Sequence, residues 1–180
     1  MTSYQVRALR RDDFVALREL ERDIFGAAEE DLLCAHYLRL CCEVFADTCF
    51  LALRDEHPVG YLLGFVRRRR AHCGTPAVRP EHQRRRATGM LIGAFVEAVV
   101  DQVDECWFTV KGDNVAARTL HAFLGAREVE RRRDYYGIGE DRIVSCVDRK
   151  DFDRLRERYH RLRGAAGEPV MERPSPSVAA

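Results

Sequence analysis

The sequence predicts an α/β domain in which helices cover a sheet of mixed topology. The first observation is that patterns typical of strands alternate with patterns typical of helices from residue 4 to residue 148. The second is size, because 180 residues of which 46% are apolar can bury one core and are too few for two. The third is that no apolar run is long enough to cross a bilayer, and the first residues lack the apolar core of a signal peptide. We therefore expect one soluble, cytoplasmic domain that makes no membrane contact.

The N-terminal part of the chain predicts one strand followed by two helices. Residues 4–9 alternate between polar and apolar side chains, which is typical of a short strand. Apolar residues at positions 14, 17, 20, 24 and 25 then form a helical stripe, and Asp12 or Asp13 is placed to cap that helix. Residues 29–45 repeat the helical spacing, so we expect a second helix there.

The middle of the chain predicts three consecutive strands and a long helix. Residues 48–66 form two strands around a polar turn at 54–57, and residues 71–78 form a third. Pro76 lacks the N–H group that a sheet ladder uses, so it indicates an edge, a bulge or a splay in the third strand. Residues 87–103 then have the composition of a long apolar helix.

The last third predicts a strand, a helix, two closing strands and a C-terminal extension. Residues 105–110 are typical of a buried strand, and the following helix begins at Asp113 or Asn114 and ends at Gly125. Two closing strands are expected within 126–137 and 141–147. We expect the main domain to span residues 1–150, an added helix to span 151–163, and residues 164–180 to form a disordered tail.

Cysteine and histidine do not predict a metal site. The seven cysteines are an odd number, lie mostly among apolar residues, and include no pair with the CxxC spacing of a zinc site. The six histidines add no ligand cluster. We therefore expect mostly buried thiols and no bound metal.

Arginine is strongly clustered although the net charge is only +1. Residues 67–86 contain eight arginines against one acid, Glu81, and a second basic run at 131–133 follows. This clustering suggests a polyanion partner, whereas a solvated strand end is the ordinary role of such a run.

The order of the elements resembles that of the GCN5-related N-acetyltransferase (GNAT) family over residues 4–148. Four segments carry the resemblance: the hairpin FLALRDEHPVGYLLGF, the segment VRPEHQRRRATGMLI, the helix DNVAARTLHAFLGA and the closing RRRDYYGIGEDRIV. The second resembles V-x-P-x-x-(Q/R)-x-x-G-x-(G/A), and the third resembles N-x-x-A-x-x-(L)-Y-x-x-(L)-G-F. The resemblance implies the GNAT fold, a mixed and mostly antiparallel sheet of about seven strands, splayed in the middle and flanked by four or five helices.

The segment that follows Gln83 is expected to bind the pyrophosphate of an acyl donor at a helix N-terminus. Unpaired N–H groups and the positive end of the helix dipole hold phosphates there. Gln83 matches the Q/R position, but Arg86 and Thr88 stand where the family has small residues. The resemblance implies acetyl-CoA or another acyl-CoA as donor, bound by Ala77, Val78, Gln83, Arg84, Arg85, Arg86, Ala87, Thr88, Gly89 and Asn114.

Three interpretations of the departure at this loop stay open. In the first, Arg84, Arg85 and Arg86 point onto the phosphates while backbone N–H groups bind them. In the second, a slip of one residue puts Arg84, Ala87 and Gly89 in the pattern. In the third, the donor is an aminoacyl-tRNA, as in some relatives with this fold. That RNA would contact Arg67, Arg68, Arg69, Arg70, Arg84, Arg85, Arg86, Arg131, Arg132 and Arg133.

Acyl transfer to an amine needs a hydrogen-bond donor for the carbonyl oxygen and an acid for the leaving thiolate. The resemblance implies that the Val78 N–H polarises the carbonyl. His121 stands where many relatives have the tyrosine that protonates the thiolate; an imidazolium could donate that proton, and packing at the helix surface is the alternative. Tyr136 and Tyr135 are further candidates for the acid, with pocket wall as their other role.

No general base stands out. Residues 71–78 contain no carboxylate, although relatives often have one on that strand, and His72 and Cys73 line the expected groove. Glu30, Asp31, Asp47 and Glu81 are candidate bases or solvated acids, and water can carry the proton instead. Acids in the two early helices favour a cationic acceptor.

We predict an N-acyltransferase that moves an acyl group, acetyl from acetyl-CoA foremost, to an amine of a small molecule. It would act without a metal, as a monomer or a homodimer. One alternative is the same fold with aminoacyl-tRNA as donor and tRNA as partner. The other is an inactive GNAT-like module that binds a ligand or RNA.

Overall fold

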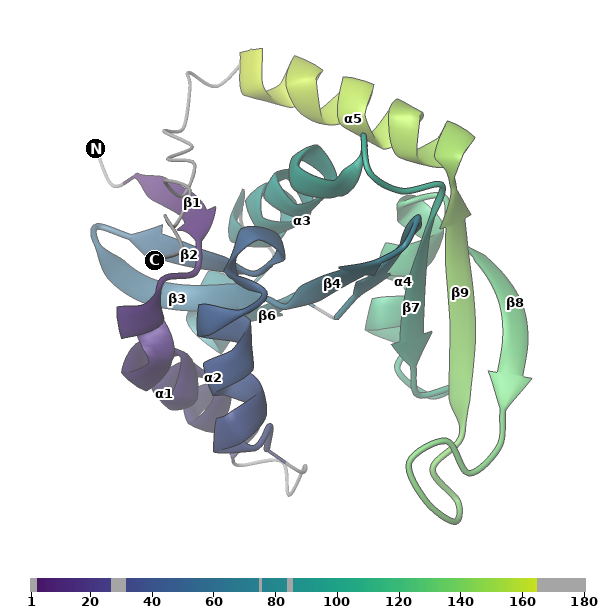
Figure 1. The fold of residues 1–180 in the computed structure, drawn as a ribbon, viewed down its shortest axis with the longest axis horizontal. Coiled ribbons are helices and arrows are strands. Elements are labelled where there is room, and N and C mark those ends of the chain that lie inside the picture. The colour runs from purple at the N-terminus through teal and green to yellow at the C-terminus, as the bar shows by residue number, and fades with distance from the viewer. Residues whose placement is uncertain (1–2, 27–31, 75, 84–85, 165–180) are drawn as a thin grey trace.

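The structure is a computed structural model that describes residues 3–26, 32–74, 76–83 and 86–164, without the side chains of residues 158 and 161–164. Its strands form two sheets (Figure 1). The first has the order β1 (Tyr4–Ala8), β2 (Phe50–Arg54), β3 (His57–Leu62) and β6 (Ala77–Val78). The second has the order β4 (Gly64–Arg67), β5 (Arg70–Cys73), β7 (Glu105–Val110), β9 (Arg142–Asp148) and β8 (Arg127–Arg132). Only β5 and β7 pair in parallel, which confirms the predicted mixed and mostly antiparallel sheet.

Two of the predicted strands are each divided between the two sheets. The segment after the turn at 54–57 forms β3 and β4, and the predicted strand 71–78 forms β5 and β6, which are separated by residues 74–76. β5 pairs with β7 only as far as His72 opposite Trp107, while β6 pairs with β3. β6 therefore diverges from β7, which is the splay that Pro76 predicted, since proline cannot continue a ladder.

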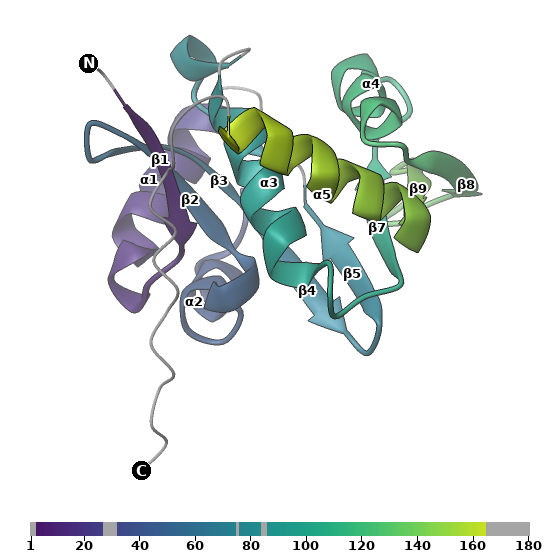
Figure 2. The same cartoon turned by 90° about the horizontal axis from the view of Figure 1, so that it is seen from above.

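Helices cover both faces of the first sheet and one face of the second (Figures 1 and 2). Residues of α1 (Phe14–Phe25) and α2 (Ala35–Glu43) form one core with one face of β2 and β3, and residues of α3 (Arg86–Val99) pack on the other face. Leu91 and Phe95 of α3 are four residues apart on the buried side of that helix. α4 (Val115–Phe123) and α5 (Arg149–Gly164) lie on the same side as α3. Short 3-10 turns, η1 (Arg11–Asp13), η2 (Ala46–Thr48) and η3 (Pro80–His82), complete the described elements.

Helix boundaries differ from the prediction where capping was misjudged. α2 is shorter than residues 29–45, because residues 32–34 are not helical and residues 29–31 lie outside the described residues. Asp13 precedes α1 but does not cap it; its carboxylate accepts hydrogen bonds from Arg7 at 2.6 and 2.7 Å and from the Arg10 N–H at 2.7 Å. Asn114 does cap α4, since its side chain accepts the Ala117 N–H at 3.0 Å, and Gly125 with a φ of +83° follows the helix end as predicted.

The C-terminal helix is docked on the body of the protein (Figure 2). It starts at Arg149, two residues before the predicted start, and Asp148 accepts the N–H of Asp151 at 3.0 Å. Phe152 is 2% exposed within the main core. α5 approaches α3 so closely at Gly93 that a Cβ there would lie 1.6 Å from the Tyr159 ring. The tail was predicted over residues 164–180, but Gly164 is the last residue of α5, and residues 165–180 lie outside the described residues.

Two absences apply to the described part of the chain. None of its helices combines the length and the apolar character that a membrane crossing requires. It also contains no group of three or more His, Cys, Asp or Glu side chains arranged to hold a metal ion. Five of the seven cysteines are buried, as their apolar surroundings predicted, and burial raises the pKa of the Cys73 thiol.

Candidate active site

The splay leaves backbone groups of β6 without a neighbouring strand on one side. The Arg79 N–H donates to the Val59 carbonyl at 2.9 Å, so the alternation of an antiparallel ladder directs the N–H and C=O of Val78 away from β3. The Gln83 side chain donates to that Val78 carbonyl at 3.1 Å. Ala77 and Val78 are each 4% exposed. The Val78 N–H therefore points toward the opening of the splay, and Gln83 fixes the adjacent carbonyl instead of standing free for a phosphate.

α3 begins close to this backbone. Arg86 is its first residue, and the N–H groups of its first turn have no partner inside the helix. Ala87 is buried in the main core, Thr88 is half-buried, and Gly89 is exposed with no atom within 4 Å of where a Cβ would stand. Arg84 and Arg85 lie outside the described residues. The open space at Gly89 leaves room for a ligand beside the first turn of α3.

His121 lies in an apolar cavity of about 20 Å³ between α3, α4 and α5. It is 3% exposed, its ring centroid lies 4.7 Å from that of Phe108 on β7, and its Nδ1 has no hydrogen-bond partner among the described residues. Burial lowers the pKa of His121, an effect that the more distant Glu128 opposes. The lowered pKa favours the neutral ring over the imidazolium that the sequence analysis considered. A packing role, the other alternative, fits the buried ring, which lies in the core and not at the helix surface. The other cavity walls include Cys73, Pro76, Phe95, Val96, Leu124 and Leu155.

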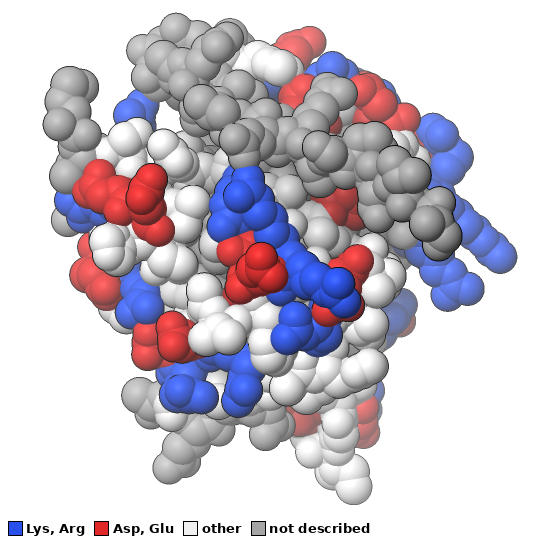
Figure 3. Space-filling view, turned by 60° about the vertical axis from the view of Figure 1, so that its left-hand side comes forward, with Lys and Arg blue, Asp and Glu red and all other residues white. Residues whose placement is uncertain are grey.

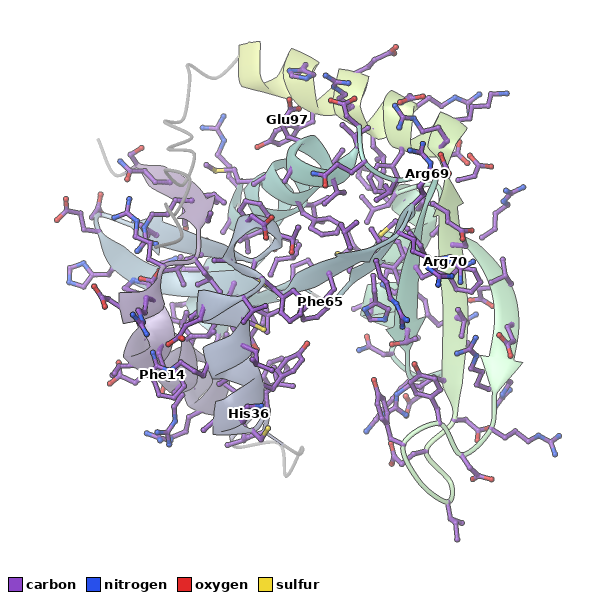
Figure 4. All side chains as sticks on the ribbon, viewed as in Figure 1. Phe14, His36, Phe65, Arg69, Arg70 and Glu97 are labelled. Carbon is purple, nitrogen blue, oxygen red and sulfur yellow. The ribbon has the colours of Figure 1, made fainter. Side chains whose placement is uncertain are left out.

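The opposite face of the second sheet forms a groove of about 700 Å³. Side chains alternate along β7 between the two faces of the sheet. Trp107 and Thr109 therefore line this groove, while Cys106 and Phe108 face the main core. Phe65 of β4 lies between α2 and the strands β7 and β9 (Figure 4), and its ring is 5.8 Å from that of Tyr37. The remaining groove walls are Arg67, Arg68, Arg69, Arg70, Ala71, His72, Asp104, Glu105, Arg132, Tyr135 and Val144.

The acidic side chains of the groove are already paired. Arg69 donates to Asp104 at 2.5 and 2.6 Å, and Arg70 donates to Glu105 at 2.5 Å. Arg70 also stacks on Trp107, with its guanidinium carbon 4.8 Å from the ring centroid. The two carboxylates therefore offset these two arginines and attract no further cation.

His72 is a functional candidate that the sequence analysis placed in the groove without a role. It lines the groove on β5 opposite Trp107, next to the point where the sheets part. Burial lowers its pKa, which favours the neutral imidazole. The ring makes no hydrogen bond to another described residue, which leaves it available to accept a proton from a bound group.

The buried pair of Glu21 and Tyr61 was missed by the sequence analysis. Glu21 is 4% exposed on α1, accepts the Leu33 N–H at 2.9 Å and accepts the Tyr61 hydroxyl. Burial and the adjacent carboxylate raise the pKa of Tyr61, so its hydroxyl keeps its proton. Tyr61 is opposite Ala77 in the β3–β6 ladder. The sequence signal for this pair was an acid within the apolar stripe of α1. The hydrogen bond links α1 to β3 at the position next to β6.

The other predicted acids and tyrosines are less well placed. Glu30 and Asp31 lie outside the described residues, and Asp47 and Glu81 are exposed in η2 and η3. Tyr136 is 67% exposed and lines neither the cavity nor the groove, whereas Tyr135 lines the groove. The structure thus brings Tyr135, and not Tyr136, to a candidate binding surface.

The basic runs are partly neutralised. Arg131 pairs with Asp141 at 3.4 Å and Arg132 with Glu130 at 2.9 Å, while Arg133 is exposed. Basic and acidic side chains are intermixed on the face that Figure 3 shows. Such pairing reduces the charge that a polyanion would meet.

The sequence matches the model of the acetyltransferase (GNAT) family over residues 14–126. The chain belongs to this family. Among curated protein sequences no significant match is found.

Solved structures with this fold include several acetyltransferases. Diaminobutyrate acetyltransferase EctA from Paenibacillus lautus, in complex with its substrate and coenzyme A, aligns with a TM-score of 0.69 at 20% identity, over 82% of this chain and 96% of that one. The ribosomal-protein-S18-alanine N-acetyltransferase from Escherichia coli aligns with a TM-score of 0.66 at 20% identity, over 81% and 94%. Arabidopsis thaliana Naa50, bound to the bisubstrate analogue CoA-Ac-MVNAL, aligns with a TM-score of 0.69 at 16% identity, over 81% and 99%. These likenesses confirm the predicted GNAT fold.

Proposed function

We propose that this GNAT protein is an N-acyltransferase that moves an acyl group, acetyl foremost, from acyl-CoA to an amine of a small-molecule acceptor. The observation that carries the proposal is the splay between β6 and β7. It directs the Val78 N–H away from β3, while the α3 N-terminus and an apolar cavity lie on one side of the sheets and a groove of about 700 Å³ lies on the other. Donor and acceptor can thus approach one reaction centre from opposite faces.

The donor side fits acyl-CoA through groups that have no partner among the described residues. Bound acyl-CoA supplies an activated thioester carbonyl. The first-turn N–H groups of α3 and its dipole offer a phosphate site, with Arg86 exposed beside them. The Val78 N–H is directed to polarise a carbonyl oxygen at the splay. Asn114 uses its Oδ1 to cap α4, which leaves its amide NH₂ group free to donate to the donor's pantetheine arm.

His121 fits the role of hydrogen-bond donor to the leaving sulfur. Neutral imidazole donates through one nitrogen and accepts through the other, so the ring needs no positive charge for this role. Its unpartnered Nδ1 is buried at the apolar cavity that Pro76 also lines. That cavity of about 20 Å³ is too small for a pantetheine arm, so this role requires the cavity to open when the donor binds. In this surrounding a hydrogen bond to developing negative charge is strong, because little water screens it.

His72 fits the role of general base on the acceptor side. An amine must lose a proton when it attacks a carbonyl, and a neutral imidazole within the groove can accept it. The residue stands on the strand where relatives often have a carboxylate. The new C–N bond forms as the C–S bond breaks, and the amine proton passes to His72 and then to water.

The alternative donor, aminoacyl-tRNA, is less well supported by the charges. Arg69, Arg70, Arg131 and Arg132 each pair with an acid, so four of the ten arginines proposed to contact RNA are partly neutralised.

The test is acyl transfer from acetyl-CoA to a panel of amines, followed by mass spectrometry of the acetylated products. We expect transfer by the wild-type protein and a loss of kcat of about 10²-fold or more for His72→Gln. His57→Gln changes an exposed histidine in the β2–β3 hairpin and serves as the matched control. Absence of transfer to every amine, or an equal loss in both variants, would overturn the proposal.

A further inference from the structure

We propose that the acceptor amine carries an oxyanion group, a carboxylate or a phosphate, that Arg67 and Arg68 bind at the outer end of the groove. This inference rests on the proposed function and names the substrate class of the same site. It differs from the sequence-based expectation of a cationic acceptor, which relied on acids of the early helices.

The groove has more positive than negative side chains. Five arginines line it against two carboxylates, and both carboxylates pair with Arg69 and Arg70. Arg132 pairs with Glu130, which is not part of the groove wall. Arg67 and Arg68 line the groove and form no ion pair within the part of the chain that the structure describes. The unneutralised charge of the groove is therefore positive, and it attracts an oxyanion and repels a second ammonium group.

The chemistry of guanidinium favours this class of ligand. Arginine binds carboxylate and phosphate through parallel N–H donors, which gives directional contacts that a point charge does not give. Arg68 has a φ of +56° in the tight β4–β5 turn, so two consecutive arginines project from one hairpin tip. The partners Asp104 and Glu105 hold Arg69 and Arg70 of the same hairpin in place (Figure 4).

The aromatic wall of the groove suggests what lies between the two ends of the acceptor. Trp107, Phe65 and Tyr135 line the groove, and Trp107 and Phe65 flank His72 on the two neighbouring strands. The Trp107 Nε1 is buried and has no hydrogen-bond partner among the described residues. An apolar or flat segment packed here would cover the rings, and a polar atom of that segment could accept the indole N–H.

The geometry also sets the distance between the amine and the oxyanion of the acceptor. The reaction centre lies beyond Cys73, and the arginine tip lies at the start of β5, so the two are separated by the length of that strand. The four residues of β5 make three residue steps, which span about 10 Å. The amine and the oxyanion of the acceptor should therefore be on the order of 10 Å apart. An α-amino acid, whose carboxylate is next to its amine, is too short to engage both.

The test uses amine pairs that differ only in the oxyanion. The probes are ω-aminobutanoate, ω-aminohexanoate and ω-aminooctanoate, each with its primary amide, and O-phosphotyramine with tyramine. We expect kcat/KM for ω-aminooctanoate to exceed that of its amide by about tenfold, through KM, and to exceed that of ω-aminobutanoate. The phosphotyramine pair shows whether phosphate is preferred to carboxylate.

Variants link the preference to the two arginines. Arg67→Gln combined with Arg68→Gln should remove the tenfold preference by lowering the kcat/KM of ω-aminooctanoate to about that of its amide. Arg154→Gln alters an exposed arginine on α5 away from the groove and should leave the preference intact.

Each result has a distinct meaning. Equal transfer to charged and amide probes overturns this inference and leaves the proposed function standing, whereas transfer to none overturns the proposed function itself. Salt-sensitive tRNA binding that the double variant abolishes, without any preference among amines, would show that the arginine tip binds RNA and would overturn the inference as well.

Discussion

Replacing His121 by leucine separates the structural contribution of this residue from its functional one. A buried polar atom without a partner costs about 1–3 kcal/mol of stability, and Nδ1 is such an atom. Leucine removes this cost, and the adjacent cavity of about 20 Å³ gives its extra volume some space. It also loses the ring contact with Phe108, which contributes about 0.5–1.5 kcal/mol.

The balance predicts that His121→Leu raises the free energy of unfolding by about 1 kcal/mol. For a chain of this size that corresponds to a rise in Tm of about 2–4 °C. Acyl transfer should fall by about 10²-fold in the same variant, because the leaving sulfur loses its hydrogen-bond donor. Differential scanning calorimetry and steady-state kinetics measure the two effects on one preparation.

His121→Asn is the control for this prediction. It keeps polar atoms in the apolar cavity and removes the aromatic ring, so it should lower both Tm and activity. A Tm of His121→Leu well below that of the wild type would show that Nδ1 has a partner in solution. Full activity of His121→Leu would show that the ring has no part in the transfer.

Three further outcomes follow from the described contacts. Gly93→Ala should lower stability by about 1–3 kcal/mol, because the new Cβ would lie 1.6 Å from the Tyr159 ring and α5 must shift; limited proteolysis of α5 checks this. Gly89→Ala should instead raise the free energy of unfolding by up to about 1 kcal/mol through helix propensity and weaken acetyl-CoA binding in calorimetry, and unchanged binding would place the phosphates elsewhere. Burial lowers the pKa of His72 and His121 in the folded protein. The free energy of unfolding should therefore fall as pH drops below the unfolded pKa near 6.5. A His121→Leu variant should show a shallower pH dependence of this free energy in chemical denaturation.

The fold was predictable because each element has a local signal. The apolar composition of residues 105–110 gave the bounds of β7, and the cap at Asn114 and the glycine at 125 gave those of α4. Pro76 indicated an edge, a bulge or a splay through a chemical property that no context changes, its missing N–H. The division of the strands between two sheets was not predictable, since it depends on pairing between distant segments.

The site was predictable only in part, for a physical reason. Val78 and the α3 N-terminus follow from backbone geometry, which the motif specifies. The state of His121 depends on burial by α3, α4 and α5, so its neutral ring could not be read from one segment. The pairing of Arg69 and Arg70 with Asp104 and Glu105 likewise joins residues 35 positions apart, and it decides which arginines of the groove stay free.

Calorimetric titration of acetyl-CoA into the protein, repeated in the presence of an excess of tRNA, tests the central proposal most directly. The account predicts one acetyl-CoA per chain, with an affinity that tRNA does not change and that Gly89→Ala reduces. Titration without binding of acetyl-CoA, or displacement of acetyl-CoA by tRNA, would contradict it.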